Sequence, residues 1–321
     1  MGIKKTGKNK YRFRLLLLHP RNWLTWISLG LFFIITLLPL SLIDALSFRL
    51  GKLAASKNKK RFNIAVKNLA LCFPKKTTQK IELMAMQHFQ MQLRSVFHYF
   101  ILWWRPVPVV QDIIIKIGFE KIEKYRQQEK NIIILLVHSV GLEFAGAAIA
   151  FDYDTVAPYK KMRNPVINWM VANSRLRFSK SYNGKHGGKL FTREDGLRPL
   201  IREARAGKIL VYLADEDLGE KHSIFAPFYG VQKATLPVLG RLAKLCDAVV
   251  LPCVSCYDST SKKYQVKLLP AIQGLPSGND ETDSLKMNEA IESAVNQCPV
   301  QYFWTLRYFQ TRPEGEKSVY E

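Results

Sequence analysis

Five short apolar runs, separated by stretches with helical spacing, constrain most strongly what this chain can fold into. The runs cover residues 112–117, 131–137, 208–214, 248–257 and 264–269. They have the length and the Ile, Val and Leu content of buried strands. Helical patterns cover residues 142–150, 165–176, 196–206 and 237–246. Because strands that alternate with helices form parallel sheets, the pattern predicts an α/β fold with a mostly parallel sheet flanked by helices.

A histidine and a carboxylate follow the second apolar run. His138 comes directly after residues 131–137, and Glu143 lies five positions later, in the first turn of the next predicted helix. Ligands of such sheets bind beyond the carboxyl ends of the strands. Gly141 permits a sharp bend there, and a helix N-terminus favours a negative charge. We predict a catalytic pair in which Glu143 orients His138, and His138 removes a proton from a substrate hydroxyl.

The spacing of this pair is weak evidence when it stands alone. With 6 histidines and 26 acidic residues in 321, about 0.5 such spacings are expected by chance. A structural histidine at the end of a strand is the alternative interpretation. Support has to come from other parts of the chain.

Arginines surround the predicted helix 165–176. Arg163 and Asn164 precede it, and Arg175 and Arg177 lie at its end. The planar guanidinium group suits phosphate and carboxylate ligands, so we expect these residues to bind anionic groups of a substrate. A solvated basic face is the alternative.

Two carboxylates follow the run 208–214. Asp215 and Asp217 lie at the same predicted edge of the sheet as His138. A metal site would need further ligands that the sequence does not offer nearby. We expect the two carboxylates to support the arginines or to close the site, and we predict no metal or cofactor.

The net charge of +22 is concentrated near the N-terminus. Residues 1–61 contain 13 Lys and Arg against one acidic residue, Asp44. They flank residues 22–43, which carry no charge and which, as a helix of about 33 Å, would span a bilayer. A cleaved signal peptide or a buried core helix is the alternative. We therefore predict five segments: a basic tail at 1–21, a membrane helix at 22–43, amphipathic lipid-facing helices at 44–110, a catalytic domain at 111–312 and a tail at 313–321.

The five cysteines are an odd number, which predicts reduced thiols and a cytosolic main domain. Cys253 and Cys256 match the C-x-x-C pattern. They lie within the predicted strand 248–257, where a spacing of three places two side chains on opposite faces of the sheet. We therefore expect no redox or zinc site here.

In their order along the chain, these blocks resemble the late acyltransferases of lipid A biosynthesis, the lauroyl/myristoyl transferase family of Gram-negative bacteria. The matching blocks are Asn68–Pro74, His138–Glu143, Arg163–Arg177, Asp215–Gly230 with Ala234–Thr235, and Gln301–Gly315. Five ordered blocks make the resemblance specific. It implies a fold like that of the glycerolipid acyltransferases.

The resemblance also implies a reaction and a location. A fatty acyl group would pass from an acyl carrier protein thioester to a hydroxyl on an acyl chain of a lipid A precursor, at the cytoplasmic face of the bacterial inner membrane. The implied partners are acyl carrier protein, the glycolipid precursor and anionic inner-membrane lipids. His138 and Glu143 would be catalytic. The expected substrate contacts are Arg163, Asn164, Arg175, Arg177, Asp215, Asp217 and Arg307.

Two other functions fit parts of the sequence. The H-x-x-x-x-E pattern also serves acyltransferases that act on glycerophosphate or on other glycolipids. The positive charge alone would suit a non-enzymatic membrane protein that binds anionic lipids. Nucleic acid is a poorer partner, because the charge surrounds an apolar segment and no nucleic-acid motif is present.

Overall fold

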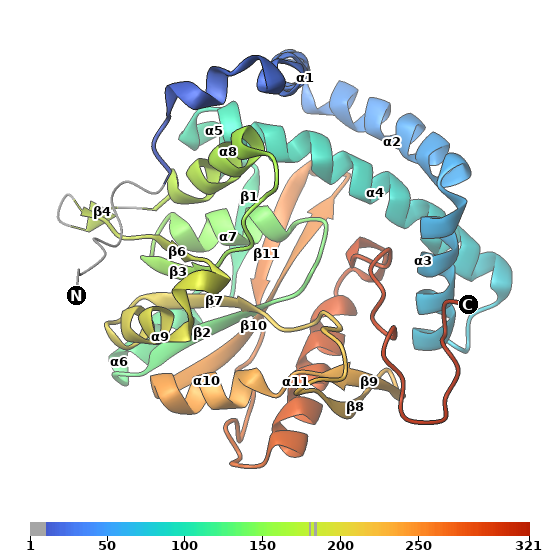
Figure 1. The fold of residues 1–321 in the computed structure, drawn as a ribbon, viewed down its shortest axis with the longest axis vertical. Helices are drawn as coiled ribbons and strands as arrows, with labels where there is room; N and C mark the ends of the chain where they lie inside the picture. Colours follow the sequence, from blue (N-terminus) through green and yellow to red (C-terminus); the bar gives the residue numbers. More distant parts are fainter. Residues whose placement is uncertain (1–10, 180, 183–184) are drawn as a thin grey trace.

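A seven-stranded sheet forms the centre of the computed structural model, which describes residues 11–321 except 180, 183 and 184 (Figure 1). The strand order is β1-β11-β10-β2-β7-β3-β6. The strands are β1 (Ile114–Ile117), β2 (Asn131–Leu136), β3 (Thr155–Pro158), β6 (Lys189–Phe191), β7 (Ile209–Leu213), β10 (Ala248–Asp258) and β11 (Lys263–Leu268). All neighbours pair in parallel except β10 and β11. The prediction of a mostly parallel sheet is confirmed.

The five predicted strands correspond to β1, β2, β7, β10 and β11. The sequence patterns missed β3 and β6, which have only four and three residues. They also missed two small antiparallel pairs outside the main sheet. These are β4 (Ser181–Tyr182) with β5 (Lys185–His186), and β8 (Ile224–Phe228) with β9 (Val231–Thr235).

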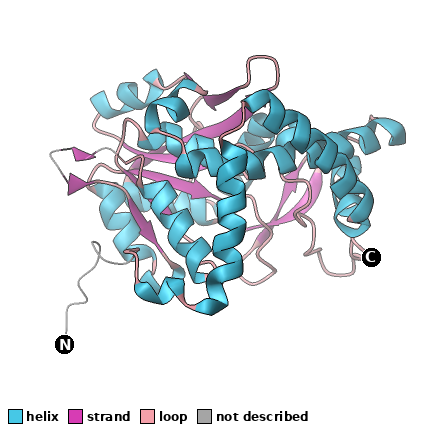
Figure 2. Cartoon of the chain, turned by 90° about the horizontal axis from the view of Figure 1, so that it is seen from above, coloured by secondary structure: helices cyan, strands magenta, loops and turns pink. Residues whose placement is uncertain are grey.

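Helices cover both faces of the sheet (Figure 2). They are α3 (Lys59–Cys72), α4 (Thr78–Trp104), α5 (Val107–Asp112), α6 (Glu120–Gln127), α7 (Leu142–Ala150), α8 (Pro165–Leu176), α9 (Leu197–Arg205), α10 (Val238–Cys246) and α11 (Asp280–Val295). Alternate residues of β2 enter two different cores. Ile133 and Leu135 pack in the core that contains α9, α10 and α11, whereas Ile134 and Leu136 pack in the core that contains α7. This alternation buries β2 on both faces, as expected for a central parallel strand.

The prediction of one continuous helix over residues 22–43 is wrong. The segment forms two helices, α1 (Trp23–Thr36) and α2 (Leu40–Lys57). Pro39 lies at the break, where it lacks an amide proton and disfavours a helical conformation for Leu38. Within the part of the chain that the structure describes, no helix is both long enough and apolar enough to cross a bilayer.

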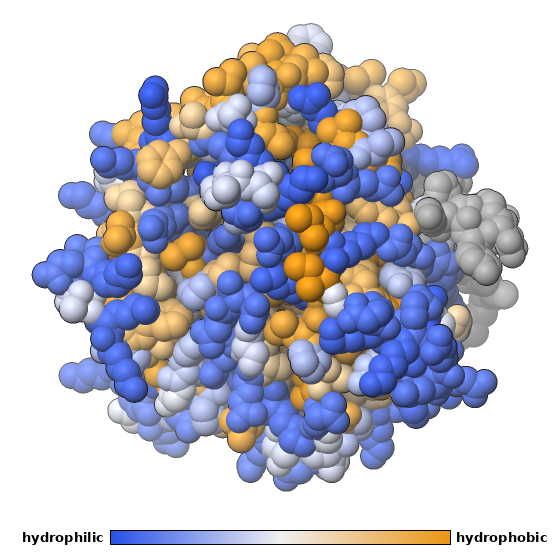
Figure 3. Space-filling view, turned by 180° about the vertical axis from the view of Figure 1, so that it is seen from behind, coloured by the Kyte–Doolittle hydropathy of each residue, from blue (hydrophilic) through white to orange (hydrophobic). Residues whose placement is uncertain are grey.

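The N-terminal helices nevertheless present apolar side chains to solvent. These residues are exposed: Leu15, Leu16, Trp23, Leu24, Ile27, Leu31, Ile34, Leu37, Leu42 and Phe48. Apolar side chains gather along the upper edge of the molecule in Figure 3, where α1 lies. The other side of α2 packs beside α4 (Figure 1). We call the exposed apolar side chains of residues 15–48 the apolar face.

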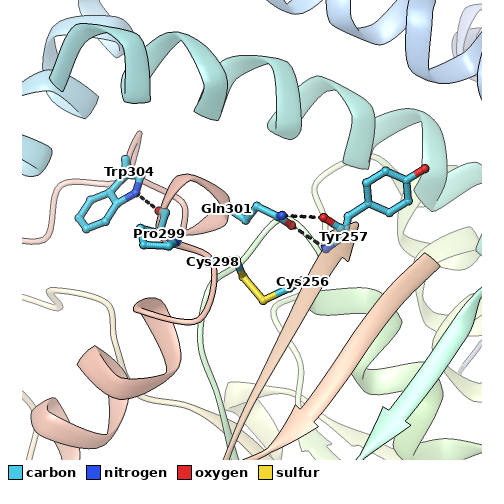
Figure 4. Close-up of a disulfide and its surroundings, with 6 residues drawn as sticks. All are labelled: Cys256, Tyr257, Cys298, Pro299, Gln301 and Trp304. Atoms are coloured by element: carbon cyan, nitrogen blue, oxygen red, sulfur yellow. Dashed lines mark hydrogen bonds between the residues drawn. A yellow bond between two sulfur atoms is a disulfide. The ribbon is translucent and has the colours of Figure 1, made fainter. Parts of the chain in front are cut away.

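The prediction that all five thiols are reduced is wrong. Cys256 and Cys298 form a disulfide, with their Cα atoms 6.0 Å apart (Figure 4). Cys253 and Cys256 do lie on opposite faces of the sheet, as predicted, because they pack in different cores. The argument from the odd number of cysteines failed because five cysteines can form one disulfide and leave three free thiols. The chain after α11 returns Cys298, 42 positions away, to the end of β10.

Candidate active site

The imidazole of His138 pairs with the carboxylate of Asp215. Both residues follow adjacent parallel strands, and in the register Leu136 of β2 lies opposite Leu213 of β7. Two residues further on, His138 Nδ1 lies 2.5 Å from Asp215 Oδ1. The backbone N–H of His138 donates to Asp215 Oδ2 at 2.7 Å. One carboxylate therefore holds both the ring and the main chain of His138.

This pairing determines which ring nitrogen is available for chemistry. When Nδ1 carries a proton and donates it to Asp215, Nε2 is left unprotonated as an acceptor. His138 is partly accessible, whereas Asp215 is only 1% exposed. Burial lowers the pKa of His138, but the charge and hydrogen bond of Asp215 outweigh it, so the pKa is raised above its ordinary value. The pair has the geometry of a general base with an orienting carboxylate.

The C-terminal segment holds the loop that carries His138. The N–H of Val140 donates to the carbonyl of Gln301 at 2.8 Å, and the N–H of Phe303 donates to the carbonyl of His138 at 2.8 Å. The side chain of Gln301 makes two hydrogen bonds of 2.8 Å to the backbone of Tyr257 (Figure 4). These contacts give the Gln301–Gly315 block a structural role, which is to clamp the active-site loop to β10.

Gly141 is required by close packing rather than by backbone conformation. Its φ of −94° is accessible to any residue, so the expected bend does not depend on glycine. A Cβ atom at this position would lie 2.6 Å from the carbonyl oxygen of Ser255. The absence of a side chain therefore lets the loop after His138 lie directly against β10.

Glu143 contacts Arg175 rather than His138. Arg175 Nε donates to Glu143 Oε2 at 3.0 Å, and a second, shorter contact joins Arg175 Nη2 to Glu143 Oε1. The guanidinium also lies 5.6 Å from the centre of the Tyr159 ring. Burial lowers the pKa of Arg175, but Glu143 outweighs this effect and raises it. Among the hydrogen bonds and ion pairs of the described residues, the expected contact between Glu143 and His138 does not occur, and Asp215 takes the orienting position.

An apolar cavity lies beside this pair, between α7 and α8. Leu136 and Leu213, two residues before His138 and Asp215, are part of its lining. Glu143 and Arg175 contribute charged groups to an otherwise largely apolar lining. The remaining lining residues are Leu102, Leu142, Gly146, Ala147, Ala150, Thr155, Ala157, Pro158, Ser174, Leu176, Phe178, Lys189, Leu190 and Val211. The cavity therefore places an apolar lining next to a charged pair.

Two of the predicted substrate contacts stabilise helix ends. Asn164 caps α8, because its Oδ1 accepts hydrogen bonds from the N–H groups of Val166 and Ile167. Arg177 donates to the carbonyls at the end of α4, namely those of Leu102, Trp103 and Arg105. A guanidinium group at a helix C-terminus complements the helix dipole. Because Asn164 and Arg177 make these contacts, each has a structural role at a helix end.

The other predicted residues are dispersed. Arg163 is exposed ahead of α8. Asp217 accepts hydrogen bonds from the N–H and hydroxyl of Thr311, at 2.7 and 2.9 Å. Arg307 is exposed, donates to Gln310 Oε1 at 2.7 Å and lies over the Tyr320 ring. Their contacts with substrate stay predictions.

The sequence predicts the place of Asp215 but not its role. Asp215 lies at the same edge of the sheet as His138, as predicted, but it orients His138, whereas the prediction was that it supports the arginines or closes the site. His138 directly follows the run 131–137, and Asp215 directly follows the run 208–214. A contact between them could be predicted only if the two strands were known to be neighbours. That adjacency is a tertiary fact.

Residues 10–311 match the family described as bacterial lipid A biosynthesis acyltransferase. The chain belongs to this family. A lipid A biosynthesis acyltransferase of Haemophilus influenzae is 34% identical over 300 residues, which cover 93% of this chain and 91% of that protein. The lipid A biosynthesis lauroyltransferase of Escherichia coli is 32% identical over 313 residues, covering 97% and 99% of the two chains. The E. coli myristoyltransferase is 31% identical over 304 residues, covering 94% and 92%.

Membership of the lipid A acyltransferase family confirms the prediction of an acyltransferase. It favours this enzyme over the non-enzymatic lipid-binding protein. The relatives have lauroyl, myristoyl and other acyl transfer in their names, so family membership alone does not give the length of the acyl chain.

Proposed function

We propose that this lipid A acyltransferase moves a fatty acyl group from an acyl carrier protein thioester to a hydroxyl on an acyl chain of a lipid A precursor. The observation that carries the mechanism is the His138–Asp215 pair beside an apolar cavity. An acyltransferase needs a base to deprotonate the hydroxyl and an apolar site for the hydrocarbon chain. The His138–Asp215 pair would supply the base, and the cavity would supply the apolar site.

The reaction begins when His138 Nε2 takes the proton of the acceptor hydroxyl. The oxygen attacks the thioester carbonyl, and the ester C–O bond forms while the C–S bond breaks. The imidazolium then returns its proton to the leaving thiolate. Asp215 holds the tautomer with Nε2 free and stabilises the imidazolium. The first turn of α7 supplies the positive end of a helix dipole near the developing oxyanion.

The Glu143–Arg175 pair contributes two of the charged side chains of the cavity lining, which also contains Lys189. Arg175 is held by Glu143 and by the ring of Tyr159, so its guanidinium is fixed in one place. Fixed dipoles and charges are effective because they need no reorganisation during the reaction. We assign to this pair the role of positioning the acyl thioester next to His138. We assign it no role in proton transfer.

We further propose that the apolar face contacts the inner membrane on its cytoplasmic side. The face presents exposed leucine and isoleucine side chains on residues 15–48, while basic residues such as Arg14, Arg21 and Arg49 flank it. Apolar side chains enter the lipid interface and nearby Lys and Arg residues bind anionic headgroups. A shallow attachment of this kind would bring the lipid substrate to the enzyme.

The test is a transfer assay with purified protein, a radiolabelled acyl carrier protein thioester and a lipid A precursor. We expect His138→Ala to reduce turnover about 10²- to 10⁴-fold. A folded His138→Ala protein with near wild-type turnover contradicts the mechanism. Mass spectrometry of lipids from a deletion strain separates lipid A acylation from transfer to glycerophosphate or another glycolipid.

Membrane attachment has its own test. Vesicles with anionic lipid should carry the protein upward in a flotation gradient, and Leu24→Glu together with Ile27→Glu should abolish this binding. A matched pair of Glu substitutions at exposed Leu245 and Leu285, outside the apolar face, should leave it unchanged. Equal flotation of all three proteins contradicts the assignment of the face.

A further inference from the structure

Lys233 is a buried lysine whose charge acts on Asp215 of the His138–Asp215 pair. It lies on β9, its side chain is among the largest that are fully buried, and only 1% of the residue is exposed. Its Nζ has no hydrogen-bond partner among the described residues. The ring of Phe228 lies 5.8 Å from this nitrogen. A buried ammonium without hydrogen bonds is costly, so it requires an opposing charge nearby.

The opposing charges are the two carboxylates that follow β7. Asp215 and Asp217 are the groups whose charge stabilises the Lys233 ammonium, and Lys233 in turn stabilises the ionised form of Asp215. Asp215 is also held against His138. One buried carboxylate is therefore in contact with the His138 imidazole and is also stabilised by the charge of the Lys233 ammonium.

The remaining groups around this cluster are known. The stacked rings of Tyr302 and Tyr308, 4.7 Å apart, lie close enough for the charge of Asp215 to act on their hydroxyls. Glu216 and Arg175 act on His138, in opposite directions. Burial raises the pKa of both tyrosine hydroxyls well above its ordinary value, so near neutral pH these hydroxyls carry no charge. Two cations then oppose uptake of a proton by the His138–Asp215 pair: Arg175 acts on His138, and the ammonium of Lys233 acts on Asp215.

We propose that Lys233 is a positioning residue for the acyl transfer, whose positive charge disfavours an extra proton on the His138–Asp215 pair and so favours a His138 Nε2 that is available as a base. This rests on the proposed function, in which His138 is the base. Without Lys233 the pair gains a proton more readily, because the positive charge of Lys233 no longer repels this proton.

The sign of the effect follows from these charges. Burial lowers the pKa of Lys233 to about 8, with Asp215 and Asp217 opposing this shift. The ammonium is therefore present at pH 7 and is discharged above pH 8. Wild-type and Lys233→Met proteins should differ most below pH 8 and should become alike above it.

The experiment measures kcat/KM against pH for Lys233→Met and for wild type. We expect the acid limb of the profile to move to higher pH by about one unit, which is about a tenfold gain in proton affinity. Phe228→Leu is the matched control, because it loosens the packing around the same nitrogen without changing a charge. It should lower activity without moving the limb. Lys233→Arg, which keeps the charge, should also leave the limb in place.

A second measurement does not depend on turnover. The Cε1–H signal of His138, assigned by comparison with His138→Ala, reports its titration directly in NMR spectra. We expect an upward shift in Lys233→Met, and in Lys233→Gln if the Met variant does not fold. A uniform loss of activity with an unchanged limb and an unchanged titration overturns the proposal. If wild type shows no transfer while the titration shifts, the proposed function fails, and only the electrostatic coupling of Lys233 to the His138–Asp215 pair stands.

Discussion

Asp215 accepts hydrogen bonds from both the backbone N–H and the imidazole Nδ1 of His138, at 2.7 and 2.5 Å. This double contact places the orienting carboxylate just after the neighbouring strand β7, not in the helix that follows His138. The H-x-x-x-x-E pattern in this chain therefore divides between two ion pairs. His138 belongs to the pair with Asp215, and Glu143 belongs to the pair with Arg175.

Replacing Asp215 with Asn should remove the charge while keeping the shape. We expect turnover to fall roughly 10²- to 10⁴-fold, because the amide no longer favours the productive tautomer or stabilises the imidazolium. Asp215 raises the pKa of His138, so the residual activity should have an acid limb at lower pH than wild type. The pH profile of kcat/KM measures both effects.

The control for this substitution is Asp217→Asn. Asp217 is a neighbouring acid that bonds to Thr311 and not to His138. It should lower activity much less and should move the limb little. If both substitutions have the same profile, Asp215 has no special relation to the base.

The Glu143–Arg175 pair leads to a prediction about stability. Glu143→Gln leaves the Arg175 cation in a largely enclosed place without its partner. Because the two side chains are 20% and 31% exposed, we expect a loss of roughly 2 kcal/mol, below the cost of breaking a fully buried pair. Urea unfolding of the two single variants and the double variant Glu143→Gln/Arg175→Met should give a coupling energy above about 1 kcal/mol.

A surface pair supplies the comparison. Lys130 and Asp247 are 43% and 75% exposed in their ion pair. Asp247→Asn should change the unfolding free energy by less than about 0.5 kcal/mol. A coupling energy between Glu143 and Arg175 below about 0.5 kcal/mol would mean that solvent screens the pair.

The sequence predicted the sheet well where the apolar runs are long. The runs 131–137, 208–214 and 248–257 have enough buried residues to be recognised without tertiary information. β3 has four residues and ends at Pro158, so it has too little local signal to be recognised. α11 begins at an Asn279 cap with three acids in its first turn, which is a local signal for the start of a helix.

The candidate site was predictable in its location but not in its pairings. His138 and Asp215 were placed at one edge of the sheet because both follow apolar runs. Their contact depends on β2 and β7 being neighbours, which the sequence patterns do not state. The burial of Lys233 is harder still to predict from the sequence, because it depends on how the β8–β9 hairpin packs against residues that are distant in the chain.

Gly146 should control which acyl chains fit. It lines the cavity on α7, and a Cβ atom there would meet no atom within 4 Å outside its own helix turn. Gly146→Leu should therefore fill open space and favour shorter acyl chains, at about 0.8 kcal/mol for each buried methylene lost. Stability should stay the same or rise, because glycine is a poor helix former.

The measurement compares kcat/KM for acyl carrier protein thioesters of different chain length. Gly30→Leu is the control, since Gly30 also has open space around it but lies on α1, outside the cavity lining. It should leave the preference unchanged. An unaltered preference in Gly146→Leu means that the acyl chain binds elsewhere.

The Cys256–Cys298 disulfide should contribute to stability. It closes a loop with a sequence separation of 42, for which the loss of chain entropy in the unfolded state corresponds to about 4 kcal/mol at most. We expect Cys298→Ser to lower the unfolding free energy by up to this amount, and reduced wild type to behave like the variant. Thiol titration of unfolded, unreduced wild type should find three thiols, Cys72, Cys246 and Cys253. Five thiols would contradict the disulfide.

Asp44 should hold the N-terminal helices to the rest of the protein. It is the one acidic residue among residues 1–61, and it lies on α2. Its carboxylate accepts a hydrogen bond from the Tyr257 hydroxyl at 2.7 Å and contacts Arg94 Nε at 2.9 Å and His98 Nε2 at 3.2 Å. His98 Nδ1 in turn lies 2.9 Å from the Tyr264 hydroxyl. The sole carboxylate of a basic segment is thus used to fasten α2 to α4 and the sheet.

Asp44→Asn should lower the unfolding free energy by about 3 kcal/mol at pH 7, because it leaves the Arg94 charge without its partner. Burial raises the pKa of Asp44, but the hydrogen bonds from His98 and Tyr257 outweigh it and lower the pKa. The stabilisation is therefore complete above the ordinary pKa of about 4 and is lost as the pH falls through the lowered value. Urea unfolding against pH should show that the unfolding free energies of the two proteins converge only in acid.

The control is Asp280→Asn, which removes an exposed partner of Arg241 and should cost less than about 0.5 kcal/mol. An equally small effect at Asp44 would mean that α2 is held by apolar packing alone.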